Sequence, residues 1–209
     1  PGAAMAVFGN SGQSCAAGTR LFVQNGIYDE FLERLADFTS KLKVGDSLDP
    51  ASDLGPLISA RQMERVLGYM DAGREDGARQ VLGGGKANSG CSTNGYFVQP
   101  TIFADVTDDM RIAREEIFGP VLSVIRFDTV EEAIARANAS EYGLGGGVWS
   151  RDVNTIMKVA RGMRTGSVWA NCYIALDPAM PFGGYKMSGY GRESGSQHLD
   201  AFLETKALT

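Results

Sequence analysis

Residues 121–170 read VLSVIRFDTVEEAIARANASEYGLGGGVWSRDVNTIMKVARGMRTGSVWA, and this stretch decides the fold class. Three short, mostly apolar runs are typical of strands buried on both faces: 121–127, 147–150 and 167–170. Two segments with helical spacing lie between them, and each begins after a capping residue, Thr129 or Asp152. Strands that alternate with helices predict βαβ units with right-handed crossovers. We therefore expect an α/β protein with a mainly parallel open sheet flanked by helices.

The residues before this stretch continue the same alternation. Apolar side chains at steps of three and four predict amphipathic helices over 27–42 and 60–76. At the start of the second helix, Ser59 and Gln62 have the spacing of a capping box. Two further apolar runs predict strands: 21–24 and 101–104.

Glycine and proline predict loops in two places. Residues 83–90 (GGGKANSG) are expected to form a surface turn. From Pro178 to Gly195 the chain has no room for a helix of more than a turn or two, so we expect an ordered loop. Residues 203–208 then alternate apolar and polar side chains, which predicts an edge strand that invites a partner chain.

Composition excludes several classes of protein. Of the 209 residues, 44% are hydrophobic and 22% charged, which is close to globular averages and allows one large domain, or one domain with an appendage. The net charge of -5 argues against binding to nucleic acid, because no positive field draws phosphates in. No apolar run approaches the roughly 18 to 20 residues that cross a bilayer, so we expect a soluble protein without a membrane partner.

The chain start, the thiols and the single histidine narrow the chemistry. Residues 1–8 lack an initiator Met and the features of a secretion signal, so we expect a fragment or a processed chain. Cys15, Cys91 and Cys172 are an odd number at wide spacings, which favours reduced thiols in a cytoplasmic protein and no metal site. With His198 as the only histidine, a Ser-His-Asp triad or a histidine-based zinc site is disfavoured.

The first candidate site is the thiol of Cys15. Small residues surround it in 12–18 (GQSCAAG) and would let a substrate carbonyl approach, so Cys15 is a candidate nucleophile. A buried structural thiol is the more common reason for such a composition. A helix beginning near Ser11 or Gln13 would change that balance, because its amides would favour the thiolate and hydrogen-bond an oxyanion.

Two further segments are candidates for ligand contacts. Residues 114–120 (REEIFGP) place two adjacent carboxylates where one of them could bind a ribose diol. From the residues alone, a solvated charge pair in a loop, with Phe118 closing the core, is the more common explanation. Residues 171–173 and 181–186 bring aromatic side chains beside flexible loops, which suits either a pocket or a core. Neither the G-x-G-x-x-G fingerprint after a strand nor the Walker spacing is present, so we expect any cofactor domain to lie elsewhere.

Taken together and in this order, these segments resemble the C-terminal catalytic half of the aldehyde dehydrogenase superfamily, essentially from end to end. Four motifs carry the resemblance: 10–15 (NSGQSC) is similar to the catalytic-cysteine motif, 115–120 to E-E-I-F-G-P, 181–184 to P-F-G-G, and 188–193 to S-G-x-G-R-E. Agreement at four sites in one order is specific.

The resemblance implies a role for several residues. Cys15 would be the nucleophile, Glu116 would bind the nicotinamide-side ribose, and Phe118 would pack near the nicotinamide. Gln62 would also touch that ribose, although its capping role is an equal interpretation. Leu176 and Phe182 would line the aldehyde channel, and Asn171 would support the structure beneath it.

The reaction that the resemblance implies is the NAD- or NADP-dependent oxidation of an aldehyde to a carboxylic acid. A thiohemiacetal on Cys15 would become a thioester, which a glutamate-activated water would hydrolyse. In the family that glutamate lies in an upstream E-L-G-G-K motif, which these residues lack, as they lack the nucleotide-binding domain that holds most of the cofactor. We therefore expect the 209 residues alone to be inactive.

The resemblance also implies a domain organisation and an assembly. Residues 1–187 would form the catalytic domain, and 188–209 a C-terminal loop and oligomerisation strand, so a homodimer or homotetramer is expected of the parent enzyme. Two alternatives remain open at this point. One is a CoA-acylating relative, and the other is a non-catalytic scaffold or interaction fragment.

Overall fold

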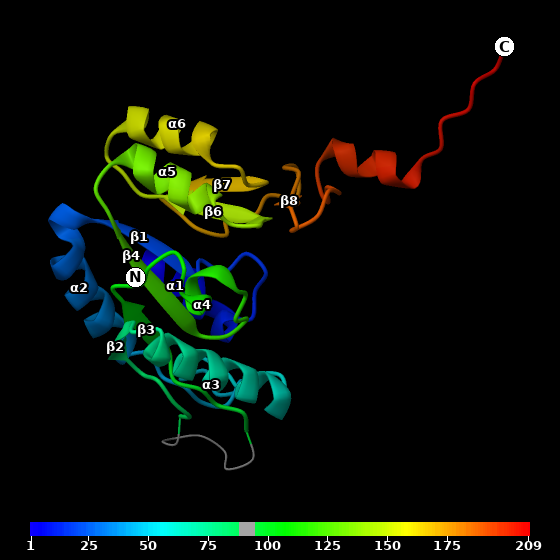
Figure 1. The fold of residues 1–209 in the computed structure, drawn as a ribbon. Coiled ribbons are helices and arrows are strands. Elements are labelled where there is room, and N and C mark those ends of the chain that lie inside the picture. Colours follow the sequence, from blue (N-terminus) through cyan, green and yellow to red (C-terminus); the bar gives the residue numbers. More distant parts are fainter. Residues whose placement is uncertain (88–94) are drawn as a thin grey trace. The chain divides into compact units, whose positions relative to one another are not determined.

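The computed structural model describes residues 1–87 and 95–209 (Figure 1). The chain divides into two compact units, Pro1–Ala133 and Ile134–Thr209, and each is described by itself. None of the helices in the described ranges is both long enough and apolar enough to span a membrane.

The first unit is built on a four-stranded sheet in the order β1-β4-β3-β2. Its strands are β1 (Arg20–Gln24), β2 (Arg79–Leu82), β3 (Thr101–Ala104) and β4 (Val121–Phe127). β1 and β3 run parallel to β4 on its two sides, and β2 pairs antiparallel with β3 at the edge. The expectation of an α/β protein with a mainly parallel sheet is confirmed.

Helices cover both faces of this sheet (Figure 1). α1 (Gly2–Phe8) and α2 (Tyr28–Ser40) pack on one face, whereas α3 (Ala60–Glu75) and the short α4 (Arg111–Arg114) pack on the other. Alternate residues of β4 divide between the two cores: Leu122 and Val124 join α1 and α2, and Val121 and Ile125 join α3 and α4. Side chains alternate along a strand, so a strand between two helical layers is apolar at successive positions.

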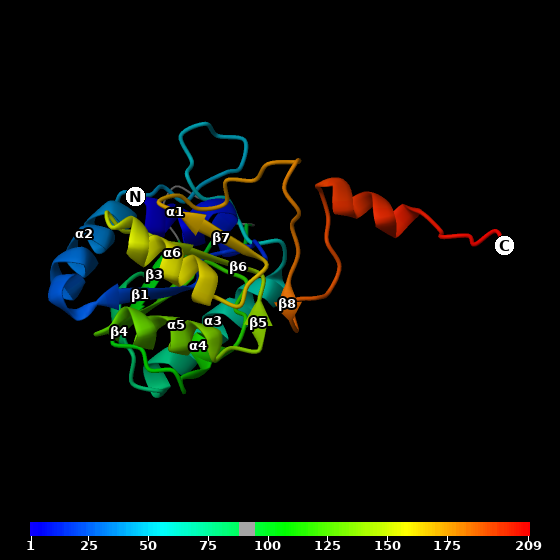
Figure 2. The same cartoon turned by 90° about the horizontal axis from the view of Figure 1, so that it is seen from above.

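The second unit contains a parallel pair of strands, β6 (Gly145–Val148) and β7 (Ser167–Ala170), linked through α6 (Val153–Gly162). Figure 2 shows α6 alongside both strands, which it contacts. The Asp152 carboxylate caps α6 by accepting hydrogen bonds from the amides of Asn154 and Thr155, as the sequence predicts. A small antiparallel pair, β5 (Tyr142–Gly143) and β8 (Tyr185–Lys186), completes the strands, and α5 (Val130–Asn138) begins at the end of the first unit.

Several predicted elements differ from the observed ones. The strand expected at 147–150 lies instead at Gly145–Val148, where it pairs in register with β7. Side chains at Gly146 and Gly147 would overlap Met163 and Tyr173, so glycine fits at these two positions. The sequence analysis did not anticipate α1, β2, α4, β5 and β8. Of the turn expected at 83–90, residues 83–87 lie in a loop and bridge, and the rest fall outside the described residues.

The strand expected at 203–208 is not formed. After the 3-10 helix η3 (Ser196–Phe202), the chain has no regular secondary structure. A strand needs a neighbouring main chain to satisfy its amides and carbonyls, and no described strand pairs with this segment. Alternating side chains were therefore not sufficient to predict a strand in the single chain.

Candidate active site

The first unit brings the thiol segment and the acidic segment to the same edge of its sheet. In the parallel register Arg20 lies opposite Ser123 and Thr101 opposite Val121, so the chain enters β1, β3 and β4 from the same side. Cys15 precedes β1, and Phe118 precedes β4. Both candidate segments therefore lie at the amino ends of the parallel strands, whereas ligands in open α/β sheets ordinarily bind at the carboxyl ends.

The segment before Cys15 follows a strained path. It forms the 3-10 turn η1 (Gly9–Gly12), within which Asn10 and Ser11 have φ values of 52° and 54°. Cys15 lies in the turn that follows, and its side chain is exposed. The helix considered near Ser11 or Gln13 does not exist, because a helical turn ends there and no described helix begins there. The thiol thus faces solvent without a helix amino terminus behind it, and the buried structural alternative is wrong.

Side-chain hydrogen bonds anchor both sides of this turn to residues 55–58. Ser11 Oγ donates to the Gly55 carbonyl at 2.7 Å. Gln13 Oε1 accepts from the Ile58 amide at 2.9 Å, and Gln13 Nε2 donates to the Pro56 carbonyl at 3.5 Å. Residues 55–58 lead directly into α3, so these hydrogen bonds hold the thiol segment close to the start of α3.

Gly12 brings the thiol segment against the acidic segment. Its φ is +70°, and a Cβ at this position would overlap the carbonyl oxygen of Gly119. A Cβ at Gly119 would in turn overlap Val66 of α3. Gly12 therefore allows the two loops to meet backbone to backbone, and Gly119 leaves room for the Val66 side chain of α3.

α3 holds the acidic segment by its main chain. Gln62 Nε2 donates to the carbonyls of Ile117 at 3.1 Å and Phe118 at 2.9 Å, and Arg65 Nη2 donates to the carbonyl of Glu116 at 2.6 Å. Phe118 has a φ of 58°, which is costly for a residue with a side chain. The hydrogen bonds from α3 offset this cost and keep the half-buried Phe118 ring at the sheet edge.

The two adjacent carboxylates have different environments. Glu115 accepts a hydrogen bond from the Tyr69 hydroxyl at 2.7 Å and two from Arg111 at 3.1 and 3.2 Å. The hydrogen bonds from Arg111 and then Tyr69 lower the pKa of Glu115. The exposed Glu116 side chain makes no hydrogen bond or ion pair with any residue that the structure describes. Glu116 is therefore the carboxylate available to a ligand, whereas the exposed Glu115 is held in an ion pair with Arg111.

Gln62 has a clear structural role. Its backbone amide donates to Ser59 Oγ at 3.2 Å, which confirms the amino-terminal cap of α3. Its side chain bonds to Ile117 and Phe118 instead of returning to the Ser59 amide, so the second half of the capping box is not formed. The contact with a ribose stays a prediction.

Three residues that the sequence analysis did not select complete this arrangement: Arg65, Tyr69 and Arg111. Gln62, Arg65 and Tyr69 are spaced by three and four residues, which places them on one face of α3. The available signal in the sequence was this spacing, which puts three side chains with hydrogen-bonding groups on one face of the helix.

The other predicted residues lie in the second unit. The Asn171 side chain donates to the Ser150 carbonyl at 3.1 Å and accepts from the Ser150 amide at 3.0 Å, so it joins the ends of β6 and β7. Tyr173 lies between Trp169 and Trp149, with ring centroids 5.0 and 6.1 Å away, and burial raises its pKa to about 12. The Asn171 bonds hold the ends of β6 and β7 together, and its role beneath an aldehyde channel stays a prediction.

The two residues expected to line a channel have different exposures. Leu176 is exposed, whereas Phe182 is half-buried and its main chain pairs with Glu193 through two 2.7 Å hydrogen bonds. Their role toward an aldehyde stays a prediction.

The described residues contain free thiols and no cluster of side chains suited to a metal ion. Cys15 and Cys172 are free, as predicted, and Cys91 lies outside the described residues. Within 1–87 and 95–209 no group of three or more His, Cys, Asp or Glu side chains is arranged to hold a metal ion.

Comparison with known proteins identifies the family. Residues 1–208 match the model of the aldehyde dehydrogenase family. The chain belongs to this family.

Individual relatives agree with this assignment. The chain is 49% identical over 207 residues to a betaine aldehyde dehydrogenase of Rhizobium leguminosarum bv. trifolii, covering 99% of this chain and 42% of that protein. It is 47% identical over 209 residues to the putative aldehyde dehydrogenase DhaS of Bacillus subtilis, covering 100% and 41%. The chain thus spans about two fifths of the length of these relatives.

Solved structures show the same fold. An aldehyde dehydrogenase of Mycobacterium tuberculosis complexed with NAD+ superimposes with a TM-score of 0.93 at 48% identity, over 97% of this chain and 41% of that one. The aldehyde dehydrogenase KauB of Pseudomonas aeruginosa gives a TM-score of 0.95 at 44% identity, over 99% and 41%.

Proposed function

We propose that these residues form the thiol-bearing catalytic part of an NAD(P)-dependent aldehyde dehydrogenase, which oxidises an aldehyde to a carboxylic acid. The observation that carries the proposal is the backbone contact between Gly12 and Gly119. It joins the segment of the exposed Cys15 thiol to the segment that displays Glu116 and Phe118. A nucleophile and the groups suited to a nicotinamide nucleotide therefore belong to one rigid edge of the sheet.

Glu116 and Phe118 have the chemistry that this cofactor requires. An exposed carboxylate without a partner among the described residues accepts hydrogen bonds from a ribose diol, and a half-buried aromatic ring offers an apolar face to the nicotinamide. Gln62 is proposed to act beside them. When bound, NAD or NADP supplies the hydride acceptor. Relatives solved with NAD+ support a cofactor of this type.

Cys15 carries the covalent chemistry in this proposal. Its thiolate attacks the aldehyde carbonyl, forming a carbon–sulfur bond and an oxyanion that the Cys15 amide helps to stabilise. Loss of hydride from that carbon leaves a thioester on Cys15. Water then cleaves the carbon–sulfur bond, which releases the acid and returns the thiol.

We propose that the general base for that hydrolysis lies outside these residues, because the sequence does not contain the family's E-L-G-G-K motif. We expect the 209 residues alone to show no turnover.

We also propose a cytoplasmic homodimer or homotetramer, with 1–187 as the catalytic domain and 188–209 as the assembly segment. The aldehyde is proposed to pass along Leu176 and Phe182.

The direct test is to trap the acyl enzyme. The complete protein that contains these residues is mixed with an aldehyde and NAD+, quenched in acid and digested for peptide mass measurement. The expected result is an acyl adduct on the Cys15 peptide together with NADH formation. An adduct elsewhere, or equal NADH formation by Cys15→Ser, would overturn the proposal. Formation of free acid without added CoA separates this reaction from a CoA-acylating one.

A further inference from the structure

Tyr69 occupies a node between α3 and the acidic segment. Its side chain is buried, with 6% of the residue exposed. Its hydroxyl donates to Glu115 Oε2 at 2.7 Å and accepts from Arg65 Nη2 at 3.2 Å. The same Arg65 nitrogen donates to the Glu116 carbonyl at 2.6 Å. The Tyr69 hydroxyl thus links the Glu115 side chain to Arg65, which in turn holds the main chain of Glu116.

Charge strengthens this node. The Arg65 and Arg111 guanidinium groups lie 5.0 and 5.3 Å from the centre of the Tyr69 ring, within the range of cation–π attraction. Burial, and then the hydrogen bond to Glu115, raises the pKa of Tyr69, so the phenol remains a donor. Because the acceptor is an ionised carboxylate, the bond belongs to the stronger, charge-assisted class.

We propose that Tyr69 is a positioning residue for cofactor binding, holding Glu115 so that Glu116 and Phe118 project from a fixed main chain. The inference rests on the proposed function, because it requires Glu116 to contact the cofactor ribose. In this proposal Glu115 does not bind the cofactor, because its carboxylate is bonded to Tyr69 and Arg111. Of the two adjacent carboxylates, one orients the loop and the other binds.

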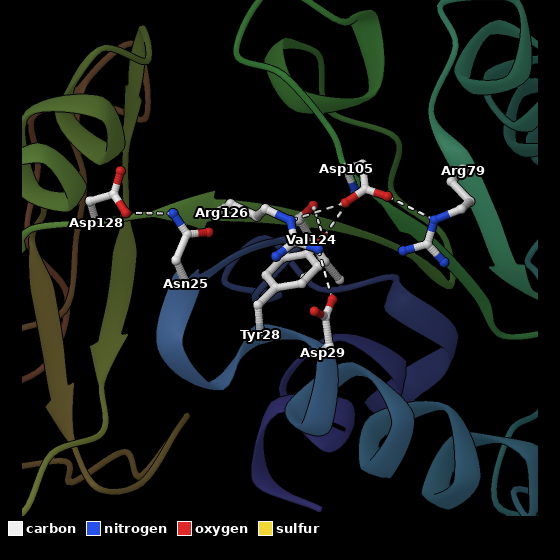
Figure 3. A network of polar contacts seen from close by, with 8 residues as sticks. All are labelled: Asn25, Tyr28, Asp29, Arg79, Asp105, Val124, Arg126 and Asp128. Carbon is white, nitrogen blue, oxygen red and sulfur yellow. Dashed lines mark hydrogen bonds and ion pairs between the residues drawn. The ribbon is translucent and has the colours of Figure 1, made fainter.

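The same unit offers a matched control at the other edge of the sheet. Tyr28 is fully buried, the Arg126 guanidinium lies 3.5 Å from its ring centre, and its hydroxyl accepts from the Asp105 amide at 2.9 Å. Figure 3 shows this second node, where the hydroxyl also donates to the Val124 carbonyl at 3.4 Å. Asp105 follows the carboxyl end of β3, so this node lies away from the candidate active site. Like Tyr69, Tyr28 is a buried phenol beside an arginine, but its hydroxyl bonds to main-chain atoms instead of a carboxylate.

The experiment compares Tyr69→Phe with Tyr28→Phe in the complete protein. Each variant loses one hydroxyl and keeps its ring. NADH binding is followed by fluorescence titration, and KM and kcat are measured separately for NAD+ and the aldehyde. We expect Tyr69→Phe to raise the Kd for NADH and the KM for NAD+ about tenfold, the factor that one hydrogen bond to a charged group contributes. The KM for the aldehyde stays within about twofold, and Tyr28→Phe changes neither constant beyond that margin.

Equal Kd values for NADH in the two variants would overturn the positioning role. Glu116→Gln separates this failure from failure of the proposed function. If Glu116→Gln weakens NADH binding and Tyr69→Phe does not, only the positioning role is lost. If Glu116→Gln leaves NADH binding unchanged, the ribose contact is lost and the positioning role with it. Should Tyr69→Phe not fold, Glu115→Gln is measured in its place, because this exposed side chain is the group through which Tyr69 acts, and the same tenfold rise is expected.

Discussion

The α-carbon of Gly12 faces the carbonyl oxygen of Gly119 so closely that no side chain fits between them. The two residues belong to segments far apart in the sequence, one leading to Cys15 and the other following Glu116 and Phe118. Their contact uses only backbone atoms, and the positive φ of Gly12 is a second requirement for glycine. The relative placement of thiol and cofactor groups therefore depends on the absence of one methyl group.

Gly12→Ala is expected to lower the free energy of unfolding by about 3 kcal/mol and to abolish aldehyde oxidation, because it combines a disfavoured φ with backbone overlap. Gly9→Ala is the matched control: Gly9 lies in the same turn, has a φ of -50° and has open space where a Cβ would lie. Urea denaturation of both variants measures the difference. Equal unfolding free energies would contradict the close contact.

Cys15→Ser is expected to reduce kcat for aldehyde oxidation by about a thousandfold or more, since the hydroxyl is a far weaker nucleophile than the thiolate. NADH binding should be unchanged. Cys172→Ser is the control, because that thiol is also exposed but lies in the second unit. Steady-state rates and NADH titrations check both variants, and a similar loss of rate in Cys172→Ser would argue against a special role for Cys15.

Gln62→Glu is expected to raise the KM for NAD+ several-fold. The new carboxylate would face the carbonyl oxygens of Ile117 and Phe118, which now receive hydrogen bonds from Nε2. Ser59→Ala removes only the cap of α3 and is expected to cost about 1 kcal/mol of stability without a change in KM. Thermal denaturation and cofactor kinetics on both variants separate the two functions, and a KM change in Ser59→Ala alone would reverse the assignment.

The stability of the first unit should fall with acid through Asp105. Burial alone would raise the pKa of Asp105, but hydrogen bonds from Arg79 and Arg126 outweigh it, so the pKa lies below its usual range. A lowered folded-state pKa means that this contribution is complete above the unfolded pKa of about 4 and is lost as the pH falls through the folded value. Because the Asp105 side chain is 40% exposed, solvent screening keeps the effect modest.

Asp105→Asn tests this pH dependence. Asparagine tolerates the φ of 56° at this position and cannot titrate. Urea denaturation between pH 5 and about pH 2 should show a shallower loss of stability in the variant than in the parent protein. Parallel curves would show that the Arg79–Asp105–Arg126 contacts contribute nothing to acid sensitivity.

The three parallel strands of the four-stranded sheet were predictable from local patterns, whereas the edge strand β2 was not. The apolar runs at 101–104 and 121–127 correspond to β3 and β4 residue for residue, because burial on both faces leaves a continuous apolar signature. The spacing of Phe31, Leu35 and Phe38 likewise located α2 to within a few residues. Cys15, Glu116 and Phe118 came from motif resemblance, and their grouping at one sheet edge agrees with the parallel register.

What sequence patterns could not provide were contacts between backbone atoms and the choice between neighbouring polar groups. The hydrogen bond from Tyr69, which helps to hold Glu115 while Glu116 beside it has no such partner among the described residues, joins residues 46 positions apart. The turn before Cys15 also differs from the helix start that was considered, because Asn10 and Ser11 adopt left-handed conformations that tertiary contacts impose. Each feature includes a distant partner, Tyr69 for Glu115 and Gly55 for Ser11.

The hydrogen bonds from α3 to the main chain of residues 116–118 have a consequence for evolution and for engineering. Gln62 and Arg65 bind the carbonyls of residues 116–118, atoms that every amino acid possesses. The side chains at 116 and 118 can thus be exchanged while the backbone path that carries them persists. A library randomised at these two positions would sample new nucleotide preferences on an unchanged frame, whereas one randomised at 62 and 65 would lose the frame first.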